Sequence, residues 1–73
     1  MKTELRLLRE KKGLSLRKLG KETGIHFTRA QRHETRREPL FPRDVERYCR
    51  VLDTEPDAIR GEDGLARTAK SED

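Results

Sequence analysis

Apolar residues recur three or four positions apart along most of the chain, the spacing of one face of an α-helix. The pattern is clearest over residues 5–8, 16–19 and 45–52. No stretch of four or more residues alternates between apolar and polar side chains, so nothing indicates a β-strand. We therefore predict a compact all-α domain of five helices.

Residues that start and stop helices give the predicted boundaries. Thr3 can cap a first helix over residues 3–12, and Ser15 can cap a second over 16–23. A third helix is expected over about 27–34. A fourth begins at Pro42, which suits a first helical turn, and continues to Leu52. A short fifth helix follows over residues 56–59.

The helical pattern stops near residue 60, which divides the chain in two. Residues 1–60 are predicted to form the domain. Residues 61–73 contain one leucine and many polar residues, so we expect a polar, disordered C-terminal tail. Between the third and fourth helices, Leu40 and Phe41 are expected to fold back into the core. His33 is expected to be packed and hydrogen-bonded, and Cys49 to be a small core residue.

Composition limits the functions that this chain of 73 residues can have. Only 30% of the residues are hydrophobic and 44% are charged, so the core is expected to be small. A single cysteine cannot form an internal disulfide, and no metal-ligand spacing is present. No catalytic residue set and no Gly-rich phosphate loop occur, so we expect no enzyme and no cofactor. Without a signal peptide or a long apolar run, a cytoplasmic protein is expected.

Charge is distributed unevenly. Residues 15–37 hold seven basic and two acidic residues, whereas residues 53–73 hold three basic and seven acidic residues. A basic region of this kind is typical of a protein that binds a polyanion. A highly charged surface with no ligand would have the same composition, so charge alone leaves both interpretations open.

The basic region contains two short helices joined by a turn, from Ser15 to Glu34. Gly20 would allow close approach of another helix, and Gly24 can end the first of the pair. In the second, Ala30 and His33 are expected to face inward. Its other faces carry Phe27, Thr28, Arg29, Gln31 and Arg32. A helix that buries so little is suited to contact a ligand.

This stretch resembles the helix-turn-helix of the phage-repressor and Cro (Xre-type) family. The resemblance runs from about Glu4 to Ile59, and it implies a lambda-repressor-like fold. Its signature is a series of short motifs in a fixed order. They are Gly13-Leu14-Ser15, Leu19 followed by a small residue, Gly24-Ile25, Glu34, a basic loop ending in Pro39, and Leu52. The family implies sequence-specific binding of double-stranded DNA by a bacterial or phage transcriptional regulator.

Carried over position by position, the resemblance assigns base reading to Phe27, Thr28 and Arg32, with His26, Arg29 and Gln31 at the margin. Arg32 could donate two hydrogen bonds to guanine, and Phe27 could contact a thymine methyl group. Folding of Phe27 into the core is the alternative. His26 stands where the family usually has a Ser or Thr cap.

The expected phosphate contacts lie at both ends of the motif. Ser15 and Arg17 flank the free N–H groups at the start of the second helix. Leu16 replaces the phosphate-binding glutamine of the family. Arg36, which replaces the usual glycine, and Arg37 follow the reading helix. The family also implies a structural ion pair between Arg9 and Glu34.

Two further expectations concern partners. The family implies a dimer, and we predict a weak homodimer formed through residues near 52–59. The alternative function is a protein-interaction module, antitoxin-like, that would use the acidic C-terminal region. RNA binding is less favoured, because three aromatic residues offer little surface for stacking unpaired bases.

Overall fold

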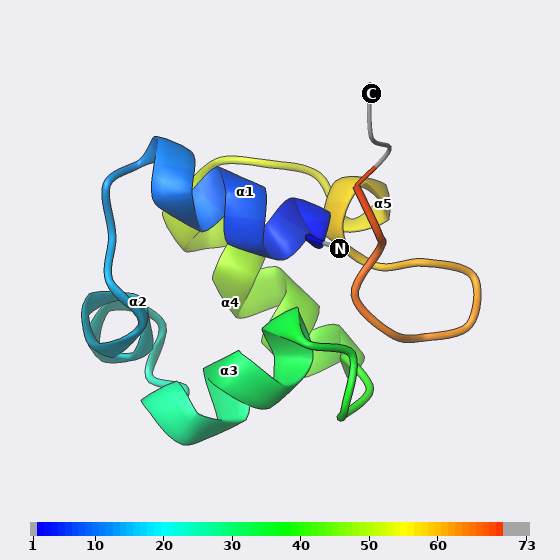
Figure 1. Cartoon of the computed structure of the whole chain (residues 1–73), viewed down its shortest axis with the longest axis horizontal. Helices are drawn as coiled ribbons and strands as arrows, with labels where there is room; N and C mark the ends of the chain where they lie inside the picture. The colour runs from blue at the N-terminus through cyan, green and yellow to red at the C-terminus, as the bar shows by residue number, and fades with distance from the viewer. Residues whose placement is uncertain (1, 70–73) are drawn as a thin grey trace.

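Five helices surround one core in the computed structural model, which describes residues 2–69 (Figure 1). They are α1 (Glu4–Lys11), α2 (Leu16–Thr23), α3 (Phe27–Glu34), α4 (Pro42–Leu52) and α5 (Pro56–Ile59). The predicted all-α class and helix order are confirmed. Only α1 differs in its bounds, because Thr3 is its N-cap and Lys12 its C-cap.

Side-chain oxygens start the first two helices as expected. Thr3 Oγ1 accepts a hydrogen bond from the Arg6 N–H at 3.3 Å, and Ser15 Oγ accepts one from the Lys18 N–H at 3.0 Å. Each bond satisfies one N–H group that has no partner within the helix. The capping residues therefore account for where α1 and α2 begin.

Each helix contributes at least one fully buried side chain to the core. These side chains are Leu5, Leu19, Ala30, Tyr48 and Ile59. Leu40, from the loop between α3 and α4, joins them as predicted. α3 forms the lower edge of the molecule in Figure 1, away from both ends of the described chain. The face of α3 opposite Ala30 is therefore left uncovered by the other helices.

The loop after α3 turns at Arg36, whose φ of 63° lies in the left-handed region. Arg36 stands where the family usually has a glycine. Arg36 itself adopts a conformation that glycine favours, at a cost of about 1–2 kcal/mol. Its side chain offsets this cost by donating a hydrogen bond to the Ala66 carbonyl at 3.1 Å and by pairing with Asp63.

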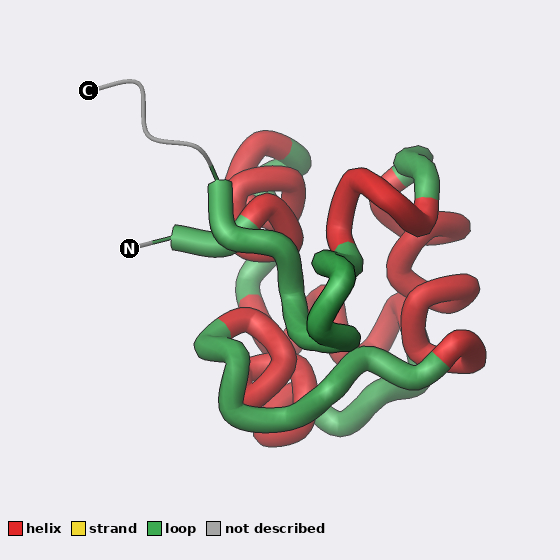
Figure 2. Tube along the Cα trace, turned by 90° about the vertical axis from the view of Figure 1, so that its right-hand side faces the viewer, coloured by secondary structure: helices red, strands yellow, loops and turns green. Residues whose placement is uncertain are grey.

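The segment 61–69 is not the disordered tail that we predicted. Ala66 is fully buried, and backbone bridges join Thr3 to Thr68 and Arg60 to Ala66. The Glu4 N–H donates to the Arg67 carbonyl at 2.8 Å, and the Leu40 N–H donates to the Gly64 carbonyl at 2.8 Å. Figure 2 shows this segment as a loop that runs across the helices. Residues 70–73 lie outside the described part of the chain.

Two further expectations concerned apolar residues, and the first of them, burial of Phe41, is wrong. Phe41 is 56% exposed, because it is the extended N-cap residue of α4 and its neighbour Leu40 enters the core instead. Leu52 and Ile59, which were expected to form a dimer contact, are buried within the single chain. The described apolar surface near residues 52–59 therefore gives no support to a homodimer.

Burial of Ala66 predicts that Ala66→Asp lowers the free energy of unfolding by about 3–5 kcal/mol, since the new carboxylate would be buried without a partner. Thermal unfolding followed by circular dichroism measures this loss. Glu62→Asp places the same side chain at an exposed position of the segment and should melt like the parent. Equal melting temperatures for the two variants would mean that residues 61–69 do not pack on the domain.

Candidate nucleic-acid interface

α2 and α3 are held at a fixed angle by close backbone packing at Gly20. A Cβ atom at this position would lie 2.6 Å from the Ile25 carbonyl oxygen and 3.1 Å from the Phe27 nitrogen. Gly24 ends α2 with a φ of 79°, which favours glycine. The turn therefore needs a glycine at both positions, as the sequence indicated.

His26 starts α3 in place of a Ser or Thr cap. Its Nδ1 atom accepts a hydrogen bond from the Thr28 N–H at 3.1 Å. The His26 ring also stacks on the ring of Phe27, with 4.7 Å between centroids and 25° between planes. His26 therefore positions the first turn of the helix rather than projecting freely.

The rotation of α3 about its axis agrees with the expected inward and outward faces. Ala30 and His33 are fully buried. Gln31 and Arg32 are exposed, and Thr28 is half-buried. Because Thr28 and Arg32 are four residues apart, they lie on the same side of the helix.

Phe27 is half-buried and lies outside the core, so the alternative of a core phenylalanine does not hold. The Arg17 guanidinium carbon lies 4.4 Å from the centre of its ring, a cation–π contact. Together with the His26 stack, this contact restrains the ring at the start of α3. The restraint links α2 to the N-terminal end of α3.

The expected phosphate residues have different surroundings. Ser15 and Arg17 are exposed at the start of α2, as required for contact with a ligand. Leu16 is half-buried and packs against the core, so its side chain serves the fold. Arg37 is exposed, and its side chain has no hydrogen-bond or ion-pair partner within residues 2–69. Arg36 instead contacts Ala66 and Asp63.

The sequence analysis missed two arginines beside α3. Arg43 and Arg47 are exposed on α4, and they line a surface hollow together with Arg29 and Phe41. The guanidinium of Arg47 also reaches the α2–α3 turn, 3.3 Å from where a Cβ atom on Gly24 would lie. Their spacing of four residues directly after Pro42 was a signal that they share one side of the first turns of α4.

Arg29 is engaged within the protein. Its Nε donates to Glu38 Oε2 at 3.0 Å, and its Nη2 donates to Asp44 Oδ2 at 3.1 Å. The hydrogen bond to Glu38, reinforced by the nearby Asp44 charge, raises the pKa of the Arg29 guanidinium above its ordinary value. Arg29 is therefore less available to a ligand than Arg32, whose side chain is 54% exposed.

The family model described as "Helix-turn-helix domain" matches residues 3–60. The chain belongs to this helix-turn-helix family. The match covers most of the chain, and it agrees with the resemblance to the Cro-like type of helix-turn-helix. Searches of curated proteins and of solved structures gave no match.

Two other classes of site were searched for in the described residues. No group of three or more His, Cys, Asp or Glu side chains in residues 2–69 is arranged to hold a metal ion. None of the five helices has the length and apolar character needed to span a membrane.

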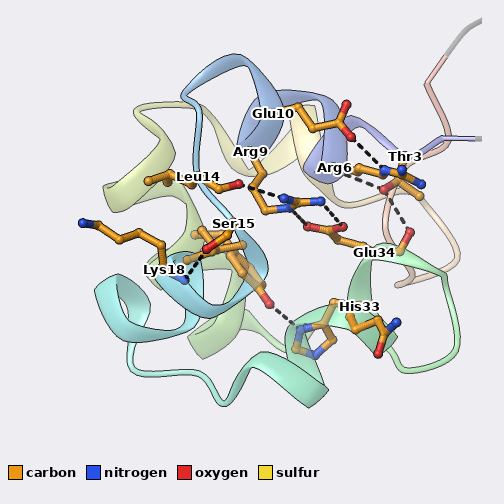
Figure 3. A network of polar contacts seen from close by, with 12 residues as sticks. Thr3, Arg6, Arg9, Glu10, Leu14, Ser15, Lys18, His33 and Glu34 are labelled. Carbon is orange, nitrogen blue, oxygen red and sulfur yellow. Dashed lines mark hydrogen bonds and ion pairs between the residues drawn. The ribbon is translucent and has the colours of Figure 1, made fainter.

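The helix-turn-helix is joined to α1 through Arg9 and Glu34, at the positions where the resemblance placed an ion pair (Figure 3). Arg9 Nε donates to Glu34 Oε2 at 2.6 Å and Nη2 donates to Oε1 at 3.3 Å, a bidentate arrangement. Arg9 Nη1 also donates to the Leu14 carbonyl at 2.7 Å, and Thr3 Oγ1 donates to the Glu34 carbonyl at 3.0 Å. These contacts tie the end of α3 to both ends of α1.

His33 makes a buried polar contact on the other side of α3. Its Nδ1 lies 2.7 Å from the Tyr48 hydroxyl oxygen, and its Nε2 has no hydrogen-bond partner among the described residues. Burial lowers the pKa of His33 below its ordinary value. The Asp44 and Glu38 carboxylates oppose this shift, whereas Arg29 adds to it. His33 is thus the packed, hydrogen-bonded residue that we expected.

Glu34→Gln should lower the free energy of unfolding by about 3–5 kcal/mol, because it leaves the Arg9 charge buried without its partner. The two side chains are only 13% and 5% exposed, so water can replace little of the lost interaction. Denaturant unfolding measures the change. Glu10→Gln, which removes exposed ion pairs with Arg6 and Lys2, serves as the matched control and should change stability little. An equally small effect of Glu34→Gln would rule out a structural role.

The lowered pKa of His33 predicts a loss of stability in mild acid. Below about pH 6.5 the unfolded chain binds a proton at this histidine that the folded chain does not. The free energy of unfolding therefore decreases as the pH is lowered. His33→Gln keeps a hydrogen-bonding group beside Tyr48 but cannot bind this proton. Denaturant unfolding between pH 7.5 and 5.5 should therefore show a smaller loss for the variant. Parallel curves would mean that His33 is not buried in its neutral form.

Proposed function

We propose that the chain is a transcriptional regulator that binds double-stranded DNA sequence-specifically, with α3 in the major groove. The observation that carries this proposal is the outer face of α3. It offers Thr28 and Arg32 to a ligand, with Phe27 at its N-terminal end and Gln31 at its margin, while the opposite face packs in the core. The major groove of B-DNA is wide enough to admit a helix presented in this way.

Base reading is assigned to three side chains of this face. Arg32 is exposed and can donate two hydrogen bonds to guanine O6 and N7. Thr28, one turn earlier, can donate, accept or make apolar contact. Phe27 can contact a thymine methyl group, and its restraint by Arg17 and His26 supports this role because a fixed ring loses little freedom on binding.

The DNA backbone would be held on both sides of the groove. The N-terminus of α2, with Ser15 and Arg17, supplies N–H groups and positive charge for one phosphate. Arg37 supplies positive charge beyond the C-terminal end of α3. Arg43 and Arg47 on α4 add positive charge beside the helix, with the Arg47 guanidinium close to the α2–α3 turn. Arg36 is not assigned a phosphate, because its side chain stabilises the loop and the C-terminal segment.

The alternative of an interaction module is less well supported. It required the acidic C-terminal region as a docking segment, but Asp63 pairs with Arg36 and residues 61–69 pack on the domain. Duplex binding through α3 does not require residues 61–69 to leave the domain. We therefore propose DNA as the principal partner and propose no protein partner.

Selection of bound sites from a random duplex pool tests the function directly and should yield one preferred sequence. On that sequence, Arg32→Ala should weaken binding by about 1–3 kcal/mol and relax the choice at one base pair, since a bidentate contact to guanine is lost. Phe27→Ala should reduce discrimination between thymine and cytosine at another position. Fluorescence anisotropy with single-base variants of the site measures both effects.

Gln31→Ala is the matched control for these variants. Gln31 is exposed on the same helix, but it lies at the margin of the proposed reading face, so its removal should matter less. Loss of specificity in Gln31→Ala together with normal specificity in Arg32→Ala would refute this assignment of the reading residues. Failure of the parent protein to select any sequence would refute sequence-specific binding itself.

A further inference from the structure

Glu38, in the loop between α3 and α4, faces three basic side chains that all come from α3. Its Oε2 accepts a hydrogen bond from Arg29 Nε at 3.0 Å and lies 3.8 Å from His33 Nε2. Its Oε1 lies 3.8 Å from Arg32 Nη1. The Glu38 side chain is only 24% exposed, so its charge acts on these neighbours with limited screening by water. One carboxylate thus lies close to all three of these side chains and acts on each of them electrostatically.

Glu38 holds its two arginines to different degrees. Arg29 is bound firmly, because Asp44 Oδ2 also accepts a hydrogen bond from it at 3.1 Å. Arg32 is attracted only across 3.8 Å, without a hydrogen bond, and its side chain remains largely exposed. Arg32 can therefore leave Glu38 for a ligand at little cost, whereas Arg29 would have to give up two hydrogen bonds.

This difference matters because a free arginine on a DNA-facing helix has two competing targets. Phosphates occur at every step of the duplex and attract any cation, so contacts with them add affinity without sequence information. The edge of a guanine offers two acceptors in a fixed geometry, and only one base pair supplies them at a given position. An acidic side chain beside the arginines competes with phosphates, which are also anions, and raises the cost of bringing a phosphate close.

We propose that Glu38 is a specificity-determining positioning residue, which keeps Arg29 away from the DNA phosphates and directs Arg32 to a base. The inference rests on the proposed function, since it concerns how α3 selects among DNA sequences. Glu38 itself touches no base. It acts through the two arginines, by removing the sequence-independent part of their binding.

The test compares Glu38→Gln with Glu46→Gln. Both variants remove one negative charge, but Glu46 is exposed on α4, and within residues 2–69 it pairs only with Arg50, at 3.5 Å. Affinities are measured by anisotropy for the selected duplex and for a scrambled duplex of the same length and composition. The ratio of the two affinities reports specificity, and a change in net charge alone should leave it unaltered.

Glu38→Gln should bind the scrambled duplex on the order of two- to five-fold more tightly, the range expected for loss of one partly exposed ion pair. The selected duplex should gain less or lose affinity, so the specificity ratio falls. The salt dependence on scrambled DNA should steepen by about one unit for each arginine released to a phosphate. Glu46→Gln should shift both affinities by the same factor.

The titration of His33, followed by NMR, reports the Glu38 contact without DNA. Glu38 favours the charged form of this histidine, so Glu38→Gln should lower the pKa of His33 further, whereas Glu46→Gln should leave it unchanged. Glu38→Asp is the second variant, needed if Glu38→Gln does not fold. It keeps the charge but withdraws the oxygens from Arg32, and it too should lower the specificity ratio.

The outcomes separate the inference from the proposed function. If the parent selects a sequence but Glu38→Gln or Glu38→Asp keeps the parental specificity ratio, Glu38 has no role in specificity and the proposed function stands. An equal gain on both duplexes would show general repulsion of DNA and would also overturn the inference. If the parent binds no duplex, the proposed function is wrong and the inference falls with it.

Discussion

The bidentate ion pair between Arg9 and Glu34 is the interaction on which the placement of α3 depends. Its two partners come from α1 and from the last residue of α3, and the same arginine also binds the Leu14 carbonyl just before α2. One guanidinium therefore fixes the relative positions of three helices. A core of small extent cannot define these positions by apolar packing alone, because few large side chains interlock. Directional polar contacts therefore help to fix the relative positions of these helices.

The polar contacts around α3 form two groups with different roles. On the side of α1, the Arg9–Glu34 pair is nearly inaccessible and holds the helix in place. On the side of α4, Arg29 and Glu38 are more accessible and border the face that we assign to DNA, whereas their neighbour Asp44 is buried. His33 lies fully buried beside the second group and hydrogen-bonds to Tyr48 of α4. The buried Arg9–Glu34 pair and the Arg29–Glu38–Asp44 group thus lie on opposite flanks of the same eight-residue helix.

Much of the fold was predictable because its determinants are local. The caps Thr3 and Ser15, the glycines of the α2–α3 turn and the inward spacing of Ala30 and His33 depend on neighbouring residues only. The conformation of residues 61–69 was not predictable in this way. Its attachment consists mainly of backbone hydrogen bonds to α1 and to the loop before α4, together with one buried alanine. Backbone groups occur in every sequence, so such contacts leave no pattern of side chains to detect.

The candidate site was predictable to a similar extent. The exposure of Gln31 and Arg32 followed from helical geometry. Whether each arginine is paired within the protein did not follow from helical geometry. It depends on acids that are distant in the sequence, such as Asp63 for Arg36 and Asp44 for Arg29. Phe41 shows the same limit for apolar residues. Either of two neighbours in the loop could have filled the core, and Leu40 is the one that does.

The pairing of Thr3 with Thr68 brings the two ends of the described chain together on the side of the molecule away from α3 (Figure 1). The chain therefore enters and leaves the described domain at nearly the same place. If this domain were inserted into another protein through these ends, it would disturb the host little, because termini that lie close together permit domain insertion. Because α3 lies on the side away from these ends, its outer face would stay accessible, so this arrangement suits the domain to being carried as a module on a larger scaffold.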